Sequence, residues 1–172
     1  MTTQTHASPM PPETGPQFYE QTWDLAYRHA LGETTSRFLA GLTERRLFGR
    51  RCPSCDRVLV PARSFCDRCH ISTGAWVEVA NEGRIEMFTV VYEPFKGLPA
   101  PPYALAYATV DGADTALVGY VRGIDLSDQA AAVKALAIGT RVKVAFSDDP
   151  KGTVADYWFE LAGLPEATQD VG

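Results

Sequence analysis

The chain has little of what most enzymes use for bond chemistry. It has only three histidines, His6, His29 and His70, in 172 residues. The motifs G-x-S-x-G, H-E-x-x-H, G-x-G-x-x-G and the phosphate-binding loop of nucleotide hydrolases are all absent from it. Acidic residues that could act as a base exist, but no pattern singles one out: Asp24, Glu33 and Asp156. We therefore expect a protein that makes or breaks no bonds on its own.

Long apolar runs and an export signal are also missing. No stretch of 18 apolar residues occurs, so we expect no membrane-crossing helix. The N-terminus lacks the apolar region of an export signal, and we expect a cytoplasmic protein with reduced thiols. Residues 1–16 are polar and rich in proline, and we expect them to be disordered, with a second loose tail at 163–172.

All the cysteines lie in one short stretch, where Cys52, Cys55, Cys66 and Cys69 form two C-x-x-C pairs. Two such pairs can supply the four sulfurs of a closed tetrahedral zinc site, in which the metal is structural and not catalytic. The alternatives are a four-cysteine iron site, disulfides, and haem c attachment at the C-x-x-C-H that ends in His70. Disulfides and haem c both require export, and haem leaves the first pair unexplained. We predict one structural Zn²⁺ per chain, with His70 outside the ligand set.

The net charge of −5 is unevenly distributed. Between Arg37 and His70, eight arginines stand against three acidic residues, which leaves a local excess of five positive charges. Arginine suits bidentate contacts with phosphate or carboxylate. This stretch either keeps a small ribbon soluble or binds phosphate or a partner, and Arg50 and Arg51 are our candidate contacts.

Residues 17–49 are predicted to form two helices. The first carries an apolar stripe at three- and four-residue steps, made of Phe18, Trp23, Tyr27, Ala30 and Leu31. Gly32 is its predicted stop, and a second helix is predicted to begin near Thr35 or Ser36 and to end at Gly49. The stripe either joins the core or packs on another protein.

From Trp76 onward the pattern changes to strands. Alternating or β-branched stretches bounded by turn residues occur at 83–92, 103–110, 115–122, 139–146 and 155–161. A helix over 126–137, capped by Ser127 or Asp128, separates the third and fourth strands. This order of elements matches a five-stranded OB-fold barrel, although periodicity alone leaves a sandwich or another small barrel open. We predict a mainly β protein with N-terminal helices at 17–49, a four-cysteine zinc ribbon at 50–75 and the barrel at 76–162.

The segment between the first two predicted strands is unusual for an exposed loop. Residues 93–103 are apolar, rich in proline and poor in charge. Proline restricts the backbone, so we expect a stiff loop. Phe95 and Leu98 either form a small satellite core under the barrel or face a partner, and we predict that Phe95, Leu98 and Tyr103 contact a partner or ligand.

Three motifs in this order resemble a known family. They are C-P-S-C-D-R-V-L-V-P-A-R-S-F-C-D-R-C, G-R-I-E-M-F-T-V-V-Y and I-G-T-R-V-K-V-A-F. Over residues 37–161 the chain resembles the acyl-CoA-associated OB-fold family with an N-terminal rubredoxin-like zinc ribbon.

The resemblance implies a small accessory subunit in a hetero-oligomer with two copies of each chain. Its partner would be a thiolase-fold enzyme acting on acyl-CoA: a thiolase, a synthase or a retro-aldolase of steroid side-chain breakdown. The partner would perform the chemistry, and this chain would help to form the acyl-CoA channel. Only Cys52, Cys55, Cys66 and Cys69 carry over, as zinc ligands.

A second interpretation is a module that binds single-stranded nucleic acid, as zinc ribbons and OB-folds often do. Such binding needs basic and aromatic side chains interleaved on the barrel face. The predicted strands supply aromatic residues but few basic ones, and the whole chain is acidic. We therefore favour the accessory subunit and do not expect nucleic acid or a membrane as a partner.

Overall fold

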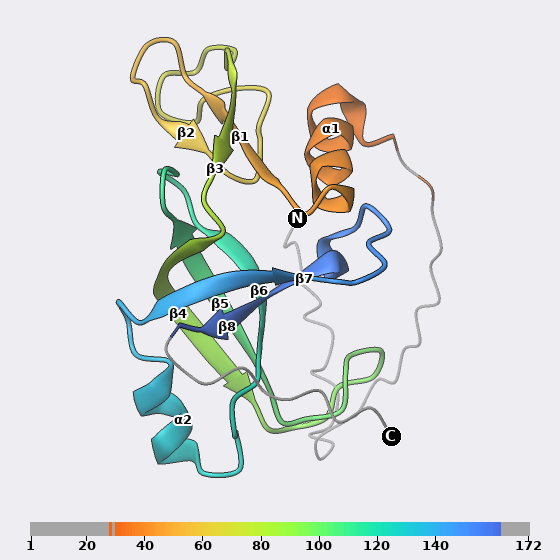
Figure 1. Cartoon of the computed structure of the whole chain (residues 1–172), viewed down its shortest axis with the longest axis vertical. Coiled ribbons are helices and arrows are strands. Elements are labelled where there is room, and N and C mark those ends of the chain that lie inside the picture. Colours follow the sequence, from red (N-terminus) through yellow and green to blue (C-terminus); the bar gives the residue numbers. More distant parts are fainter. Residues whose placement is uncertain (1–27, 29, 163–172) are drawn as a thin grey trace, which may run out of the picture. The chain divides into compact units, whose positions relative to one another are not determined.

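The computed structural model describes residue 28 and residues 30–162. The first predicted helix, with most of its aromatic stripe, and the two predicted tails at 1–16 and 163–172 lie outside the described residues. The described elements form a short N-terminal helix, a three-stranded sheet and a closed barrel (Figure 1).

The helix α1 spans Gly32–Thr43, so the predicted start at Thr35 or Ser36 and the predicted end at Gly49 are both wrong. Leu31 occupies the N-cap position and offers no side-chain oxygen to cap the first turn. Ser36 instead donates its hydroxyl hydrogen to the Gly32 carbonyl, at 2.6 Å. The helix ends early because the residues from Leu47 onward pair as a strand.

Three short antiparallel strands form the sheet that carries the cysteines. They are β1 (Leu47–Arg51), β2 (Val58–Leu59) and β3 (Trp76–Val79), in the order β2-β1-β3. Gly49 lies at the centre of β1, where an added Cβ would sit 2.7 Å from Val58 Cγ1 and 2.9 Å from the Leu59 carbonyl oxygen. The close approach of β1 and β2 therefore requires glycine at this position.

The predicted mainly β architecture and five-stranded barrel are confirmed. The strands are β4 (Glu82–Val91), β5 (Tyr103–Val110), β6 (Leu117–Arg122), β7 (Arg141–Phe146) and β8 (Tyr157–Leu161). Their order is β4-β5-β6-β8-β7, β7 pairs back onto β4, and only β6 and β8 run parallel. The helix α2 (Gln129–Ala135) joins β6 to β7, and the 3₁₀ turn η1 (Val154–Asp156) precedes β8. Asp128 caps α2 as predicted, accepting from the N–H groups of Ala130 and Ala131.

Strand alternation divides the barrel into an apolar interior and an outer surface. Along β5 the inward residues Ala104, Ala106 and Ala108 are fully buried, and the residues between them face outward. These small side chains leave room for large ones from other strands, such as Ile85 and Phe159, which are 1% and 0% exposed. Burying a side chain of that size contributes about 1.5–3 kcal/mol. The interior of the barrel is thus packed with apolar side chains.

The turn between β5 and β6 fastens the barrel to the free edge of β2. Asp114 donates its N–H to the Val58 carbonyl and accepts the Val58 N–H on Oδ2, both at 2.8 Å. Thr115 Oγ1 accepts from the Val60 N–H at 2.7 Å and donates to the Val60 carbonyl at 2.8 Å. These contacts satisfy backbone groups that an edge strand would leave unpaired. No helix among the described residues is long and apolar enough to span a bilayer.

Candidate metal centre and contact residues

The two cysteine pairs lie on turns with the same backbone geometry. In each turn the first cysteine donates its N–H to the carbonyl five residues later and accepts on its own carbonyl from the N–H four residues later. The four bonds are Cys52 N to Arg57 O, Asp56 N to Cys52 O, Cys66 N to Ile71 O and His70 N to Cys66 O, at 2.8, 3.0, 2.8 and 2.9 Å. Asp56 and His70 occupy equivalent positions and have φ angles of 61° and 55°. Asp and His are among the residue types that tolerate this left-handed conformation, so His70 has a backbone role in the turn.

The turns bring the four sulfur atoms together. The Sγ atoms of Cys52, Cys55, Cys66 and Cys69 all lie within 4.8 Å of one another, and Cys55 and Cys66 are separated by 3.8 Å. A tetrahedral zinc with bonds of about 2.3 Å places neighbouring sulfurs about 3.8 Å apart. Cys52 and Cys66 are fully buried and pack with the buried side chain of Leu59. The cluster therefore fits one tetrahedral metal ion, and His70 is not part of it.

The electrostatics of the cluster also suit a cation. The backbone N–H of Cys55 is the main reason that the pKa of Cys52 falls to about 7, with a further contribution from the N–H of Ser54. The N–H of Arg57 also favours the Cys55 thiolate, but burial and the neighbouring sulfurs raise the pKa of Cys55 to about 12. Four thiolates side by side repel one another unless a cation lies between them, and N–H groups directed at the sulfurs are typical supports of such a site.

The disulfide interpretation is wrong for this structure. All four cysteines are free. The 3.8 Å between the Cys55 and Cys66 sulfurs is also far above the bond length of about 2.0 Å that a disulfide requires.

Arg50 and Arg51, which we predicted as contacts, are both engaged inside the ribbon. Arg50 donates from Nη2 to the Thr73 carbonyl at 2.6 Å, and its guanidinium lies 5.1 Å from the ring centroid of Trp76. Arg51 forms an ion pair with Asp56 at 2.8 Å. These contacts hold the ribbon loops in place. Contact of Arg50 or Arg51 with a partner or ligand stays a prediction.

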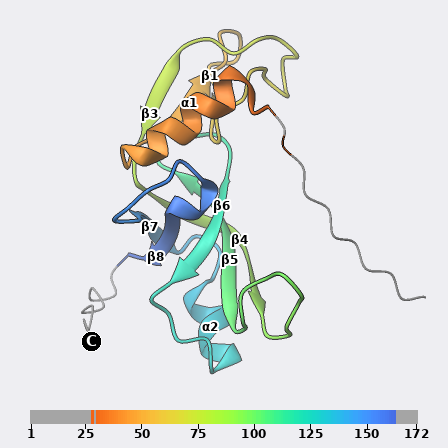
Figure 2. The same ribbon diagram turned by 90° about the vertical axis from the view of Figure 1, so that its right-hand side faces the viewer.

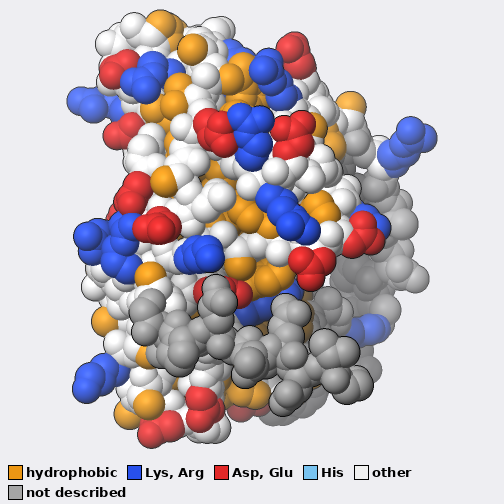
Figure 3. All heavy atoms as spheres, viewed as in Figure 1, with side chains coloured by type: hydrophobic (Ala, Val, Ile, Leu, Met, Phe, Trp, Pro, Cys, Tyr) orange, Lys and Arg blue, Asp and Glu red, His pale blue; other side chains and the backbone are white. Residues whose placement is uncertain are grey.

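Several other arginines of the basic stretch also have acidic neighbours. The pairs are Arg45 with Asp148, Arg46 with Glu44 and Glu78, Arg57 with Asp67, and Arg63 with Asp67. The hydrogen bond from Arg46 holds the pKa of Glu78 below its usual range. Positive and negative side chains accordingly alternate over the face in Figure 3. This pairing offsets much of the positive charge that the sequence concentrates in the stretch.

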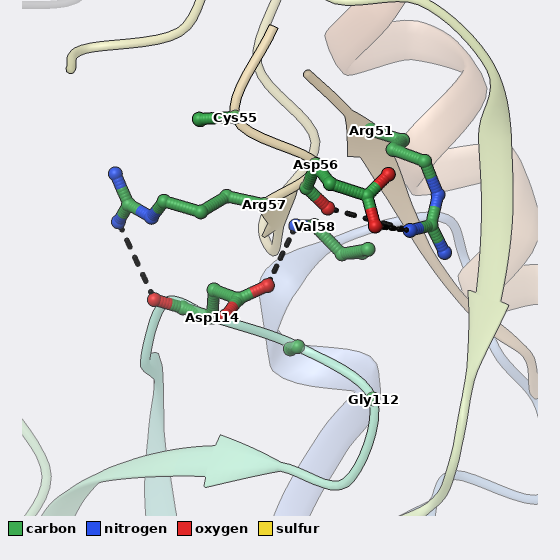
Figure 4. Close-up of a pocket in the computed structure, with 8 residues that line it drawn as sticks. Arg51, Cys55, Asp56, Arg57, Val58, Gly112 and Asp114 are labelled. Carbon is green, nitrogen blue, oxygen red and sulfur yellow. Dashed lines mark hydrogen bonds and ion pairs between the residues drawn. The ribbon is translucent and has the colours of Figure 1, made fainter. Parts of the chain in front are cut away.

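An open hollow of about 370 Å³ lies beside the first cysteine turn (Figure 4). It is bordered by Arg51, Asp56, Arg57 and the turn at Asp114. Arg57 donates to the Asp114 carbonyl at 3.4 Å and to Asp67 Oδ1 at 3.2 Å, and Arg51 pairs with Asp56. The charged groups at its border thus neutralise one another, and the hollow offers little to a charged ligand.

The predicted contact residues of the proline-rich loop lie at the surface. Phe95 and Leu98 are 61% and 55% exposed, so they do not form a satellite core under the barrel. The Leu98 N–H donates to the Phe95 carbonyl at 3.2 Å, which turns the loop back on itself. Tyr103 is partly buried and contacts the Tyr120 ring edge-on, with 5.8 Å between ring centroids.

Met87 and Val118 were not predicted from the sequence as contact residues; they are 62% and 44% exposed and lie on either side of Tyr107, on the two strands that pair with β5. The available signal was that apolar residues fill outward positions of the predicted strands. Their adjacency depends on strand register, which a single sequence does not state.

The comparisons with known proteins cover both the ribbon and the barrel. Residues 39–73 match the family model described as the ChsH2 rubredoxin-like zinc ribbon domain, and residues 76–147 match the ChsH2 C-terminal OB-fold domain. No curated protein matches the chain significantly.

Two solved structures are similar in fold. A chain of the Ltp2–ChsH2(DUF35) aldolase has a TM-score of 0.60 and 22% identity, over 78% of this chain and 99% of that one. A protein of unknown function from the DUF35 family of Sulfolobus solfataricus has a TM-score of 0.57 and 23% identity, over 76% of this chain and 86% of that one. At these identities the likeness establishes the fold.

Proposed function

Since the chain belongs to the ChsH2 family of zinc-ribbon and OB-fold proteins, we propose that it is a non-catalytic accessory subunit of a thiolase-fold enzyme that acts on acyl-CoA. The observation that carries the proposal is the presence of both family domains in one chain, in the order ribbon then barrel. The similar aldolase chain is named together with a second protein, Ltp2, which supports assembly with a different subunit.

The proposal includes one structural Zn²⁺ per chain, held by Cys52, Cys55, Cys66 and Cys69. The sulfur spacing and the N–H groups near the sulfurs support a four-sulfur metal site, and the match to a zinc ribbon model supports zinc over iron. A four-sulfur shell is closed, so the ion would fix the fold of the ribbon and supply no open position to a substrate. Because these are the only cysteines in the chain, none is left to act as a thiol nucleophile.

The acyl-CoA would be bound through the complex. We propose that Phe95, Leu98 and Tyr103 border the acyl-CoA channel at the contact with the partner, in a cytoplasmic assembly with two copies of each chain. The exposure of Phe95 and Leu98 supports this placement, since large apolar side chains at a protein surface are typical of binding sites. The partner reaction would be thiolysis, condensation or the retro-aldol cleavage of a steroid side chain.

The test is co-expression of the full chain with each thiolase-fold protein encoded in the same genome, followed by size-exclusion chromatography with light scattering. We expect one of these proteins to co-elute with the chain at a mass that fits two copies of each. A control binding measurement uses a single-stranded oligonucleotide at low and high salt. Salt-sensitive oligonucleotide binding without any thiolase-fold partner would overturn the proposal in favour of a nucleic-acid module.

A further inference from the structure

Three exposed apolar side chains lie side by side on the outside of the barrel. Met87, Tyr107 and Val118 are 62%, 49% and 44% exposed. The strand register pairs Met87 of β4 with Tyr107 of β5, and Tyr107 with Val118 of β6. Directly paired residues have Cβ atoms about 4.5–5.5 Å apart, so the three side chains form one continuous row. Figure 2 shows these three strands next to one another.

Two more uncharged rows continue this surface along the strands. Thr89 pairs with Leu105, which pairs with Tyr120, and Val91 pairs with Tyr103. We call the eight residues of the three rows the outer face: Met87, Thr89, Val91, Tyr103, Leu105, Tyr107, Val118 and Tyr120. The outer face ends at the loop that carries the exposed Phe95 and Leu98.

The outer face has the composition of a protein interface. Its eight residues carry no charge, whereas the exposed charged residues Arg84, Glu86 and Arg122 lie at its margins on β4 and β6. An uncharged centre with a charged rim is typical of surfaces that bury against another protein. The same side of an OB-fold, with the loop between its first two strands, is a common binding surface. Nucleic acid would require basic residues here, and the outer face has none.

The exposed apolar area of the outer face and its loop is also large enough for a protein–protein contact. Met87, Tyr107, Val118, Phe95 and Leu98 together present on the order of 500 Å² of apolar surface, given about 150–250 Å² for a whole aromatic side chain. This total, which is spread over the outer face and the adjoining loop, is comparable with the larger apolar patches on monomeric proteins. With the partly exposed residues of the outer face it approaches the roughly 800 Å² per partner of a stable protein–protein interface.

We propose that the outer face of β4, β5 and β6 is the surface on which the thiolase-fold partner docks. This inference rests on the function proposed above. The occupant is an uncharged apolar patch of that partner. The inward alanines of β5 are buried in the barrel core, which fixes the outer face before binding, so little entropy is lost when the partner docks.

The test compares two arginine substitutions in the full chain. Tyr107→Arg places a charge at the centre of the outer face, and Ile138→Arg places one at a residue that is 76% exposed outside it. We expect Tyr107→Arg to weaken partner binding by about 30-fold or more, the effect of losing a central interface residue. Ile138→Arg should leave the affinity unchanged, and both variants should melt close to the wild-type temperature.

The outcomes separate the docking surface from the proposed function. If the wild-type chain binds a thiolase-fold protein and Tyr107→Arg binds it equally well, the docking surface is wrong and the function stands. If the wild-type chain binds none of these proteins, the function itself fails. If the wild-type chain self-associates and Tyr107→Arg is monomeric, a second copy is the occupant and the inference is overturned.

Oxidation of Met87 by peroxide, read by peptide mass, tests whether the outer face is open in the free chain. We expect Met87 to oxidise in the free monomer at nearly the rate of the unfolded chain and to be protected in the complex. Protection in the free monomer would show that another segment of the same chain covers the outer face, which contradicts the proposal.

Discussion

Replacing Thr115 by valine should weaken the junction between the barrel and the ribbon. The Thr115 hydroxyl accepts from the Val60 N–H at 2.7 Å and donates to the Val60 carbonyl at 2.8 Å, and Val60 is 0% exposed. Valine has nearly the same shape as threonine, so the substitution removes both hydrogen bonds without leaving a cavity. Each buried backbone group left unpaired costs about 1–3 kcal/mol, and we expect a loss of about 2–4 kcal/mol.

Thermal unfolding followed by circular dichroism measures this loss. For a chain of this size, 1 kcal/mol corresponds to about 2–4 °C, so the melting temperature should fall by roughly 5–15 °C. Thr89→Val is the matched control, because Thr89 is exposed on β4. An equal melting temperature for Thr115→Val and Thr89→Val would refute the role of Thr115 in holding the ribbon.

Three further predictions concern the metal, an acid-sensitive turn and the proline-rich loop. Cys55→Ser should lose bound zinc by elemental analysis and unfold the ribbon, since structural zinc contributes on the order of 10 kcal/mol to such folds; full zinc content with an unchanged melt would refute this. Asp156 accepts from the N–H groups of Lys151 and Thr153 at 2.9 and 2.7 Å, and although burial opposes ionisation, these bonds lower its pKa. The carboxylate therefore stabilises the fold at pH values above its unfolded pKa of about 3.9, and this stabilisation is lost as the pH falls through its folded pKa. Asp156→Asn should therefore melt earlier than wild type at pH 7, with a difference that shrinks below pH of about 4, and a constant difference would contradict this. Phe95→Ala should leave the melt unchanged and reduce partner affinity, whereas a much lower melt with full activation of the partner would make Phe95 a core residue.

The strands of the barrel were predictable because they carry strong local signals, whereas their closure into a barrel was inferred from the order of the elements and the family resemblance. Residues 103–110 alternate inward and outward side chains, and they lie between a proline-rich loop and the turn residues Asp111-Gly112. The strand β5 spans the same residues, 103–110. Asp128, one of the two residues predicted as the cap, caps the first turn of α2 with its carboxylate. The ribbon strands were missed because they are two to five residues long, and β1 follows α1 after only three residues.

The metal cluster was predictable from spacing alone, because ligand identity and turn length fix which sulfurs meet. The contacts of the arginines were not predictable from the sequence. Arg50 and Arg51 looked available for a ligand in the sequence, but Thr73 and Asp56 reach them through folding of the ribbon loops. The outer face needs the strand register, which is shifted by an irregularity between Ile85 and Met87. The alternation of apolar and polar residues along β4 therefore does not predict that Met87 pairs with Tyr107.

The most direct test of the account is acyl-CoA turnover by three samples: the purified chain, its thiolase-fold partner, and the complex of the two. A shared panel of acyl-CoA esters, with product analysis by mass spectrometry, serves all three. The account predicts no turnover by the isolated chain and the highest turnover by the complex. Carbon–carbon bond cleavage or formation by the isolated, zinc-loaded chain would contradict it.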